Sequence, residues 1–321
     1  MSIITVNNIS KSYGKVKPIE DISFEVEKGE IFGIIGPDGA GKTTLFRILT
    51  TLLLADNGTA TINGFDVVRN FKEIRNDVGY MPGRFSLYQD LTVEENLNVF
   101  AKVFQTTIEE NYHLIKDIYQ QIEPFKNRRA GALSGGMKQK LALSCALIHK
   151  PSVLFLDEPT TGVDPVSRKE FWEMLRNLKK MDITILVSTP YMDEAMLCDR
   201  IALIQKGKIL KIDTPQNIVK QFDKTIIAIR TSKMSKLLTD LRNYKLTQTC
   251  FAFGDCHHVT IKSGKWKMEN GKSEIENLIE DLKNYLTENN HQEIEIKEIN
   301  ASIEDCFMEL AKTNEKLKIE N

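Results

Sequence analysis

The chain has 321 residues, about twice the roughly 150 residues of a typical domain, which predicts one large or two medium domains. Hydrophobic residues make up 41% and charged residues 27%, and these near-average fractions exclude wholesale disorder. The 43 Lys and Arg nearly balance the 44 Asp and Glu, so the net charge of −1 gives no electrostatic reason to expect a nucleic-acid partner.

From the N-terminus to about Pro215, short β-branched runs alternate with amphipathic helical patterns. This alternation predicts an α/β fold with a largely parallel sheet and helices packed around it. The clearest predicted strands are Ile31–Ile35, Val153–Leu156, Ile183–Val187, Ile201–Ile204 and, after a hairpin turn, Ile209–Ile212.

A helical subdomain is predicted at about residues 86–150, between two of these strands. Thr92 with Glu95, and Thr107 with Glu110, fit the Thr-x-x-Glu pattern of a helix start. Pro124 is expected to end the second helical stretch.

After Pro215 the pattern changes to that of a smaller α+β domain of about 100 residues. Its predicted strands are Thr225–Ile229, Phe251–Phe253 and His258–Ile261. Its predicted helices are Ser235–Asn243, Glu274–Glu288 and Ile303–Leu317. We therefore divide the chain into residues 1–220 and an accessory domain at 221–321.

A glycine-rich segment follows the strand Ile31–Ile35 and opens a helical run at Leu45–Leu54, the strand–loop–helix setting of a phosphate-binding P-loop. Its glycines let several backbone N–H groups face one phosphate at the positive end of a helix. Lys42 is expected to reach the phosphate oxygens and Thr43 to ligate Mg²⁺. The predicted nucleotide-binding residues of this segment are Gly36, Asp38, Gly39, Ala40, Gly41, Lys42, Thr43 and Thr44.

Two adjacent carboxylates end the apolar strand that begins at Val153. Acids at the end of a buried strand are costly unless a cation or ligand compensates them. This position favours Asp157 as a water-mediated Mg²⁺ ligand and Glu158 as the group that polarises an attacking water.

A second anion site is predicted where Ser134, Gly135 and Gly136 precede a helical run. Ser134 is a suitable helix N-cap, and the two glycines leave backbone N–H groups open at a positive helix end.

With these three motifs in this order, residues 2–220 resemble the nucleotide-binding subunit of an ATP-binding cassette (ABC) transporter, a P-loop NTPase with a RecA-like cassette fold. The resemblance implies ATP and Mg²⁺ as cofactors and two cassettes packed head to tail. It implies that Ser134, Gly135 and Gly136 contact the γ-phosphate of a nucleotide on the partner cassette. It also implies that Tyr13 stacks on adenine and that Gly162, Val163 and Asp164 form a dimer-contact loop.

The segments Ser188–Ala195 and Ser302–Leu310 resemble the ATPase subunits of multidrug- or lipid-type exporters. This resemblance implies a separate membrane permease as partner, with candidate contacts at Arg84 to Asp90. No apolar stretch approaches the roughly 20 residues of a membrane-spanning helix, and no secretory signal is recognisable. We therefore expect a cytoplasmic protein held on the inner face of the membrane by the permease.

Two positions depart from the family pattern. Gly83 stands where the family has a glutamine beside Mg²⁺ and the attacking water, and Pro190 where it has a histidine bonded to the γ-phosphate. Losing one positioned hydrogen-bonding group commonly slows a reaction by a factor on the order of 100 to 1,000. The chain's own site is therefore expected to turn over slowly.

Three interpretations remain open. The chain pairs with a different, complete cassette, whose site it completes with its own Ser134 segment. Alternatively, it forms a homodimer in which Glu158 alone suffices for hydrolysis. The third is a nucleotide-gated regulatory or scaffold ABC protein that is not coupled to transport.

Overall fold

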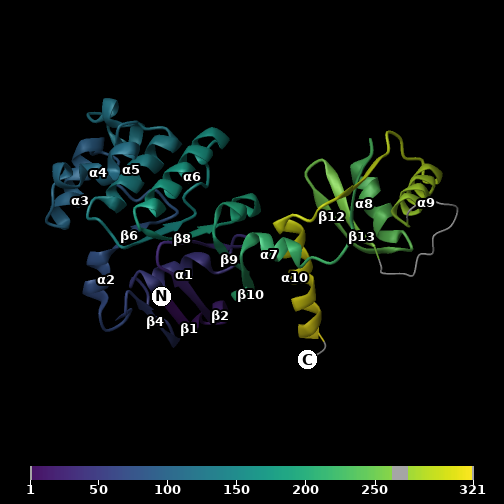
Figure 1. Ribbon diagram of the computed structural model, residues 1–321, viewed down its shortest axis with the longest axis horizontal. Coiled ribbons are helices and arrows are strands. Elements are labelled where there is room, and N and C mark those ends of the chain that lie inside the picture. The colour runs from purple at the N-terminus through teal and green to yellow at the C-terminus, as the bar shows by residue number, and fades with distance from the viewer. Residues whose placement is uncertain (1, 262–273, 320–321) are drawn as a thin grey trace. The chain divides into compact units, whose positions relative to one another are not determined.

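The computed structural model describes residues 2–261 and 274–319 (Figure 1). The described chain forms two compact units, one running to Gln216 and including the end of the last helix from Leu310, the other covering Asn217–Glu309. No helix in these described ranges combines the length and apolar character that a membrane crossing requires.

The first unit is built on a six-stranded sheet with the order β10-β9-β3-β8-β7-β6. Its strands are β3 (Ile31–Ile35), β6 (Val78–Met81), β7 (Val153–Asp157), β8 (Thr184–Thr189), β9 (Arg200–Gln205) and β10 (Lys208–Asp213). All neighbours pair in parallel except β10, which is antiparallel to β9. All five strands predicted from apolar runs are confirmed. The central β3, β7 and β8 are buried along their whole length, as expected for a parallel sheet covered on both faces.

A second, antiparallel sheet lies in the same unit and was not predicted. Its order is β2-β1-β4-β5, formed by β1 (Ser2–Tyr13), β2 (Val16–Glu27), β4 (Asn57–Ile62) and β5 (Phe65–Asp66). The β1–β2 pairing shifts register at several points, for example between Val6 and Ile9. Each shift interrupts the apolar–polar alternation that identifies a strand in a sequence.

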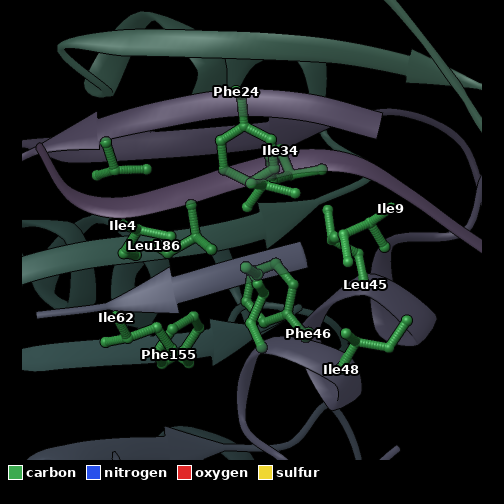
Figure 2. Close-up of a cluster of buried hydrophobic side chains, with 14 of the residues drawn as sticks. Ile4, Ile9, Phe24, Ile34, Leu45, Phe46, Ile48, Ile62, Phe155 and Leu186 are labelled. Atoms are coloured by element: carbon green, nitrogen blue, oxygen red, sulfur yellow. The ribbon is translucent and has the colours of Figure 1, made fainter. Parts of the chain in front are cut away.

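One hydrophobic core joins both sheets to helix α1 (Lys42–Leu49), and Figure 2 shows side chains from all three. Phe24 on β2 stacks on Phe32 on β3, with ring centroids 5.4 Å apart. Phe46 on α1 meets Phe155 on β7 edge to face at 6.0 Å. Burial of this face of α1 fixes the helix whose first residue is Lys42.

Helix α1 is shorter than the helical run predicted at Leu45–Leu54. It ends at Leu49, and Thr51 adopts a left-handed φ of +62°, which a continuing helix does not allow. The other helices of the first unit outside the helical subdomain are α2 (Phe71–Asp77), α6 (Pro165–Lys180) and η3 (Met192–Leu197), and α7 (Pro215–Lys220) lies at the boundary between the units.

The helical subdomain contains α3 (Val93–Val103), α4 (Ile108–Tyr119), the short turns η1 (Glu123–Phe125) and η2 (Ala130–Ala132), and α5 (Gly135–Leu147). Both predicted helix starts are confirmed as reciprocal capping boxes, Thr92 with Glu95 and Thr107 with Glu110. Pro124 does not end α4, which stops earlier at Tyr119; the proline lies inside η1, where a first-turn proline loses no hydrogen bond.

The second unit contains a four-stranded antiparallel sheet with the order β12-β13-β11-β14. In chain order its elements are β11 (Ile226–Arg230), α8 (Met234–Asn243), β12 (Thr247–Phe253), β13 (Cys256–Ile261), α9 (Glu274–Glu288) and β14 (Glu295–Ile299). This β-α-β-β-α-β order is that of a ferredoxin-like fold. Leu278, Leu282 and Leu286 on α9 lie in its core. Strand β14 was not predicted because charged residues dominate its sequence.

Helix α10 (Ile303–Ile319) carries in its first turn an acid, Asp305, that contacts the sheet of the second unit. Asp305 accepts hydrogen bonds from the backbone N–H and hydroxyl of Ser302, and its other oxygen lies 2.8 Å from His258 Nδ1. Burial acts to raise the pKa of Asp305, but the hydrogen bonds from His258 and Ser302 outweigh it, and the net pKa is below the ordinary value of 3.8.

These contacts predict a pH-dependent contribution to stability. A carboxyl group with a depressed pKa stabilises the folded state above its unfolded pKa, and this stabilisation is lost as the pH falls through the folded value. We expect Asp305→Asn to lower the free energy of unfolding by about 1.5 kcal/mol at pH 7. The difference from the wild type should narrow below about pH 4.

Chemical denaturation at a series of pH values measures this difference. Asp255→Asn is the matched control, because Asp255 is 79% exposed and pairs with Arg230 at 3.4 Å. A constant difference between Asp305→Asn and the wild type from pH 7 to pH 3.5 would contradict the assignment.

Candidate functional site

The loop between β3 and α1 carries the predicted phosphate-binding residues. Gly41, directly before the helix, has a φ of +105°, and a Cβ there would lie 2.1 Å from the carbonyl oxygen of Pro18 on β2. A side chain at position 41 would therefore clash with backbone as well as strain the loop. This glycine lets the loop close against β2 and places Lys42 at the helix start.

Lys42 is buried, with 2% of its side chain exposed. Its ammonium donates hydrogen bonds to the carbonyl oxygens of Gly36, at 2.8 Å, and Pro37, at 3.0 Å. It also forms an ion pair with Glu158 Oε1 at 3.0 Å. Three acceptors thus satisfy the three N–H donors of a charge that would otherwise be costly to bury.

A cavity of about 170 Å³ opens against this loop. Its lining residues are Pro18, Gly39, Gly41, Lys42, Thr43, Thr44 and Glu158. Asp38 is exposed beside it, whereas Gly36 and Ala40 are buried in the loop. The lining combines an ammonium, two hydroxyls and the first turn of an eight-residue helix, a donor set that suits the anionic phosphates of a nucleotide.

The two predicted carboxylates follow each other at the end of β7 but differ in environment. Asp157 is 2% exposed, and its Oδ1 accepts a hydrogen bond from the Ser188 hydroxyl at 2.7 Å. Glu158 has a left-handed φ of +52°, which is uncommon for a residue with a side chain, and its carboxylate contacts Lys42 at the cavity wall. Burial, together with the negative charge of Asp157, raises the pKa of Tyr80 to about 12.

The oxygen donors on this side of the site are of the type that Mg²⁺ binds. Magnesium prefers carboxylate and hydroxyl oxygens together with phosphate oxygens and water. Asp157 supplies a buried carboxylate and Thr43 a hydroxyl in the cavity wall. The residues present therefore fit a magnesium–nucleotide complex.

The Ser134 segment is not part of the cavity lining. Ser134 is the N-cap of α5, as predicted, and its hydroxyl accepts a hydrogen bond from the Met137 N–H at 3.4 Å. Gly136 packs so closely against Ser167 on α6 that a Cβ there would lie 2.7 Å from the serine hydroxyl. Asp164 caps α6 by accepting from the N–H groups of Val166 and Ser167.

Tyr13 lies at the end of β1, with 51% of the residue exposed. It is not among the described residues that line the cavity, and the Lys11 ammonium lies 5.8 Å from its ring centroid. Its expected stacking on adenine stays a prediction.

The two positions that depart from the family pattern lie at the ends of neighbouring strands, Gly83 against the end of β7 and Pro190 after β8. A Cβ at Gly83 would lie 2.9 Å from the carbonyl oxygen of Asp157, so the backbone would have to shift to admit a glutamine there. Pro190 directly follows β8. The hydroxyl of the preceding Thr189 donates to Glu194 at 2.5 Å and accepts from the Tyr191 N–H at 3.1 Å.

Sequence reasoning missed the buried polar residues at the end of β8. Ser188 and Thr189 are both fully buried at the carboxyl end of an otherwise apolar strand. Arg168 on α6 holds the same region, with its guanidinium 4.1 Å from the Tyr191 ring centroid and its Nε 3.7 Å from Glu194. The signal available in the sequence was two consecutive hydroxyl residues directly after an apolar run. Buried polar groups need hydrogen-bond partners, so this pattern indicates a polar site at the end of the strand.

Comparisons with known proteins place the chain in a family. The sequence pattern described as ABC transporter matches residues 19–161. Nod factor export ATP-binding protein I of Burkholderia lata is 39% identical over 220 residues, which cover 68% of this chain and 72% of that protein. The chain belongs to the ABC transporter family. The family resemblance seen in the sequence motifs is thereby confirmed.

Other relatives of the ABC chain have names that refer to drugs. The probable multidrug ABC transporter ATP-binding protein YbhF of Escherichia coli is 43% identical over 223 residues, which cover 68% of this chain. The chain spans 39% of the length of YbhF. The doxorubicin resistance ATP-binding protein DrrA of Mycobacterium tuberculosis is 37% identical over 220 residues, covering 67% of this chain and 66% of that protein.

Solved structures confirm the predicted cassette fold. An ATP binding subunit of an ABC transporter has a TM-score of 0.63 and 28% identity, covering 69% of this chain and 93% of that chain. The ATP-binding cassette MJ0796, in a dimeric post-hydrolysis state bound to ADP and Pi, has a TM-score of 0.60 and 24% identity. It covers 66% of this chain and 98% of that chain, and at this identity the similarity shows the fold alone.

Proposed function

We propose that this ABC chain is the ATP-binding and ATP-hydrolysing subunit of a transporter, that it powers a separate membrane permease, and that transport is export. The observation that carries the proposal is the buried Lys42 at the P-loop cavity, opposite Glu158. The names of the relatives, which describe ATP-binding proteins of multidrug, Nod factor and doxorubicin systems, support the direction of transport.

In this proposal the chain's residues bind the nucleotide and Mg²⁺ and activate the attacking water. Lys42 and the loop N–H groups bind the phosphates, and Thr43 with Asp157 holds Mg²⁺, which supplies charge neutralisation when bound. Glu158 accepts a hydrogen bond from the attacking water and polarises it. Tyr13 stacks on the adenine. Closure of two cassettes around ATP then moves the permease, and hydrolysis resets it.

We propose that Ser134, Gly135 and Gly136 act in trans. All three lie outside the P-loop cavity lining, and Gly136 packs on α6 just after the Asp164 loop. This arrangement supports a head-to-tail pair in which the segment completes the nucleotide site of a second cassette. We further propose residues 1–220 as the cassette and 221–321 as an accessory domain.

Two residues of the same site support the proposal that ATP hydrolysis at the chain's own P-loop is slow. Gly83 offers no side chain, and its close approach to the Asp157 carbonyl leaves no room for one without a shift. Pro190 has no side-chain donor or acceptor. We therefore favour an asymmetric pair with a more complete cassette over a homodimer. The same two residues favour, as the second candidate function, a nucleotide-gated regulator that is not coupled to transport.

A groove in the first unit is a suitable docking site for a cytoplasmic helix of the permease. Its cavity of about 400 Å³ is lined by residues that include Val78 on β6, Phe100 on α3, Phe104 directly after α3 and Ala146 on α5. Arg84 to Asp90, the permease contacts expected from the sequence, are not among the described residues that line it. Leu52 and Val103 at this groove are 58% and 68% exposed, which is unusual for large apolar side chains without a partner. Docking there would hold the chain on the inner face of the membrane.

Steady-state ATP hydrolysis by the purified chain tests the proposal, beside Glu158→Gln and at ATP concentrations where binding is measured independently. We expect ATP to bind to both proteins and both to hydrolyse it slowly and equally, because Gly83 and Pro190 supply neither of the side chains that would assist Glu158. Turnover by the wild type that Glu158→Gln abolishes would instead establish a competent homodimer. Failure of the wild type to bind ATP would overturn the proposed function.

A further inference from the structure

Ser188 is a fully buried polar residue that contacts the Asp157 carboxylate and the backbone N–H of Glu158. It lies on β8, paired in register with Asp157 on the neighbouring β7. Its hydroxyl donates to Asp157 Oδ1 at 2.7 Å. The same oxygen accepts a hydrogen bond from the backbone N–H of Glu158 at 3.1 Å.

The hydroxyl is suited to this double contact because it is both a donor and an acceptor. A serine oxygen carries one hydrogen and two lone pairs, so it can donate to Asp157 and accept from Glu158 at the same time. Alanine can do neither, and a cysteine thiol is only a weak donor. The Ser188 carbonyl oxygen accepts from the Glu158 N–H as well, at 3.0 Å, so the strand pairing itself does not depend on the hydroxyl.

The two hydrogen bonds of the Ser188 hydroxyl hold groups whose conformation matters for the site. Asp157 is buried, so the direction in which its carboxylate presents its lone pairs is set by the hydrogen bonds it accepts. Glu158 has a left-handed backbone, which persists only where surrounding contacts hold it, and that backbone directs its side chain toward Lys42.

We propose that Ser188 is a positioning residue that orients Asp157 toward Mg²⁺ and holds the turn that presents Glu158. This inference rests on the proposed ATP-binding function and assigns a role to a residue outside its three motifs. In this role Ser188 does not itself touch nucleotide or metal; it acts through the Asp157 carboxylate and the backbone of Glu158. With Gly83 and Pro190 in place of hydrogen-bonding side chains, the site depends all the more on this support.

The Mg²⁺ dependence of ATP binding tests the role, because a purely structural serine would not alter it. ATP affinity is measured by calorimetry in excess Mg²⁺ and in EDTA for the wild type, Ser188→Ala, Asp157→Asn and the double variant. We expect Ser188→Ala to weaken binding about tenfold in Mg²⁺ and less than about twofold in EDTA, as for the loss of one hydrogen bond to a charged group. In the Asp157→Asn background the same change should have less than about a twofold effect.

Ser144→Ala is the matched control, because Ser144 is equally buried and its hydroxyl donates within its own helix, to the Lys140 carbonyl at 2.9 Å. If Ser188→Ala does not fold, Ser188→Cys keeps the shape of the side chain with a slightly larger atom and is expected to show the same selective loss. Equal weakening in Mg²⁺ and EDTA, additivity with Asp157→Asn, or behaviour like Ser144→Ala would overturn the role of Ser188. A wild type that binds ATP with no Mg²⁺ dependence would instead overturn the proposed magnesium site, and one that binds no ATP the proposed function.

Discussion

Lys42→Ala is expected to weaken ATP binding by about 100-fold or more, equivalent to about 2.8 kcal/mol at 1.4 kcal/mol per tenfold. Among the described residues that line the cavity, Lys42 supplies the one cation. Truncating one partner of a buried charge pair commonly costs about 2–5 kcal/mol. The variant also leaves the Glu158 carboxylate and two loop carbonyls without their donor. Calorimetric titration with ATP in excess Mg²⁺ measures the loss.

Lys17→Ala is the control for this experiment, since Lys17 is a nearby lysine on β2 with 63% of its side chain exposed and a single weak ion pair to Glu20 at 3.6 Å. It should bind ATP with wild-type affinity. If Lys42→Ala folds, as judged by its unfolding transition, and binds ATP like Lys17→Ala, the P-loop cavity is not the nucleotide site.

The parts of the fold that could be predicted from the sequence are those in which local chemistry decides the structure. Thr92 and Glu95 lie within one helical turn, so a four-residue sequence pattern is enough to predict their reciprocal hydrogen bonds. The P-loop is similar: strand, glycines, Lys42 and helix follow one another along the chain, and backbone geometry brings them to one place. Ser134 as the cap of α5 is a third case.

The parts that could not be predicted depend on pairings between distant segments. Strand β1 pairs with β2 and β4 through shifted registers. The local pattern of apolar and polar residues does not indicate which strands pair with each other. The contact between Lys42 and Glu158 requires β3 and β7 to lie in one sheet with β8 between them. Ser188 belongs to the same class, because its significance comes from the register that sets it opposite Asp157.

Pro190→His is expected to raise the rate of ATP hydrolysis by the purified chain about 10- to 100-fold over Pro190→Ala. A positioned general acid–base group contributes about 10²–10⁴ in rate, and the lower range applies here because Gly83 still supplies no side chain. The backbone on either side of position 190 is held in place, because the Thr189 hydroxyl is hydrogen-bonded to Glu194 and to the backbone N–H of Tyr191. Imidazole would restore the hydrogen-bonding group that the family resemblance assigns to this position.

Pro190→Ala separates the two effects of the substitution, since it removes the ring constraint of proline without adding an imidazole. Hydrolysis is followed as phosphate release at saturating ATP, with ATP affinity measured for each variant. The gain should disappear when Glu158→Gln is added, because the imidazole stabilises charge but Glu158 polarises the water. A Pro190→His protein no faster than Pro190→Ala, at equal ATP occupancy, would mean that the missing imidazole does not limit this site. The slow step would then lie in assembling the second cassette against it, where the Ser134 segment of the partner must supply the contacts that one chain cannot make for itself.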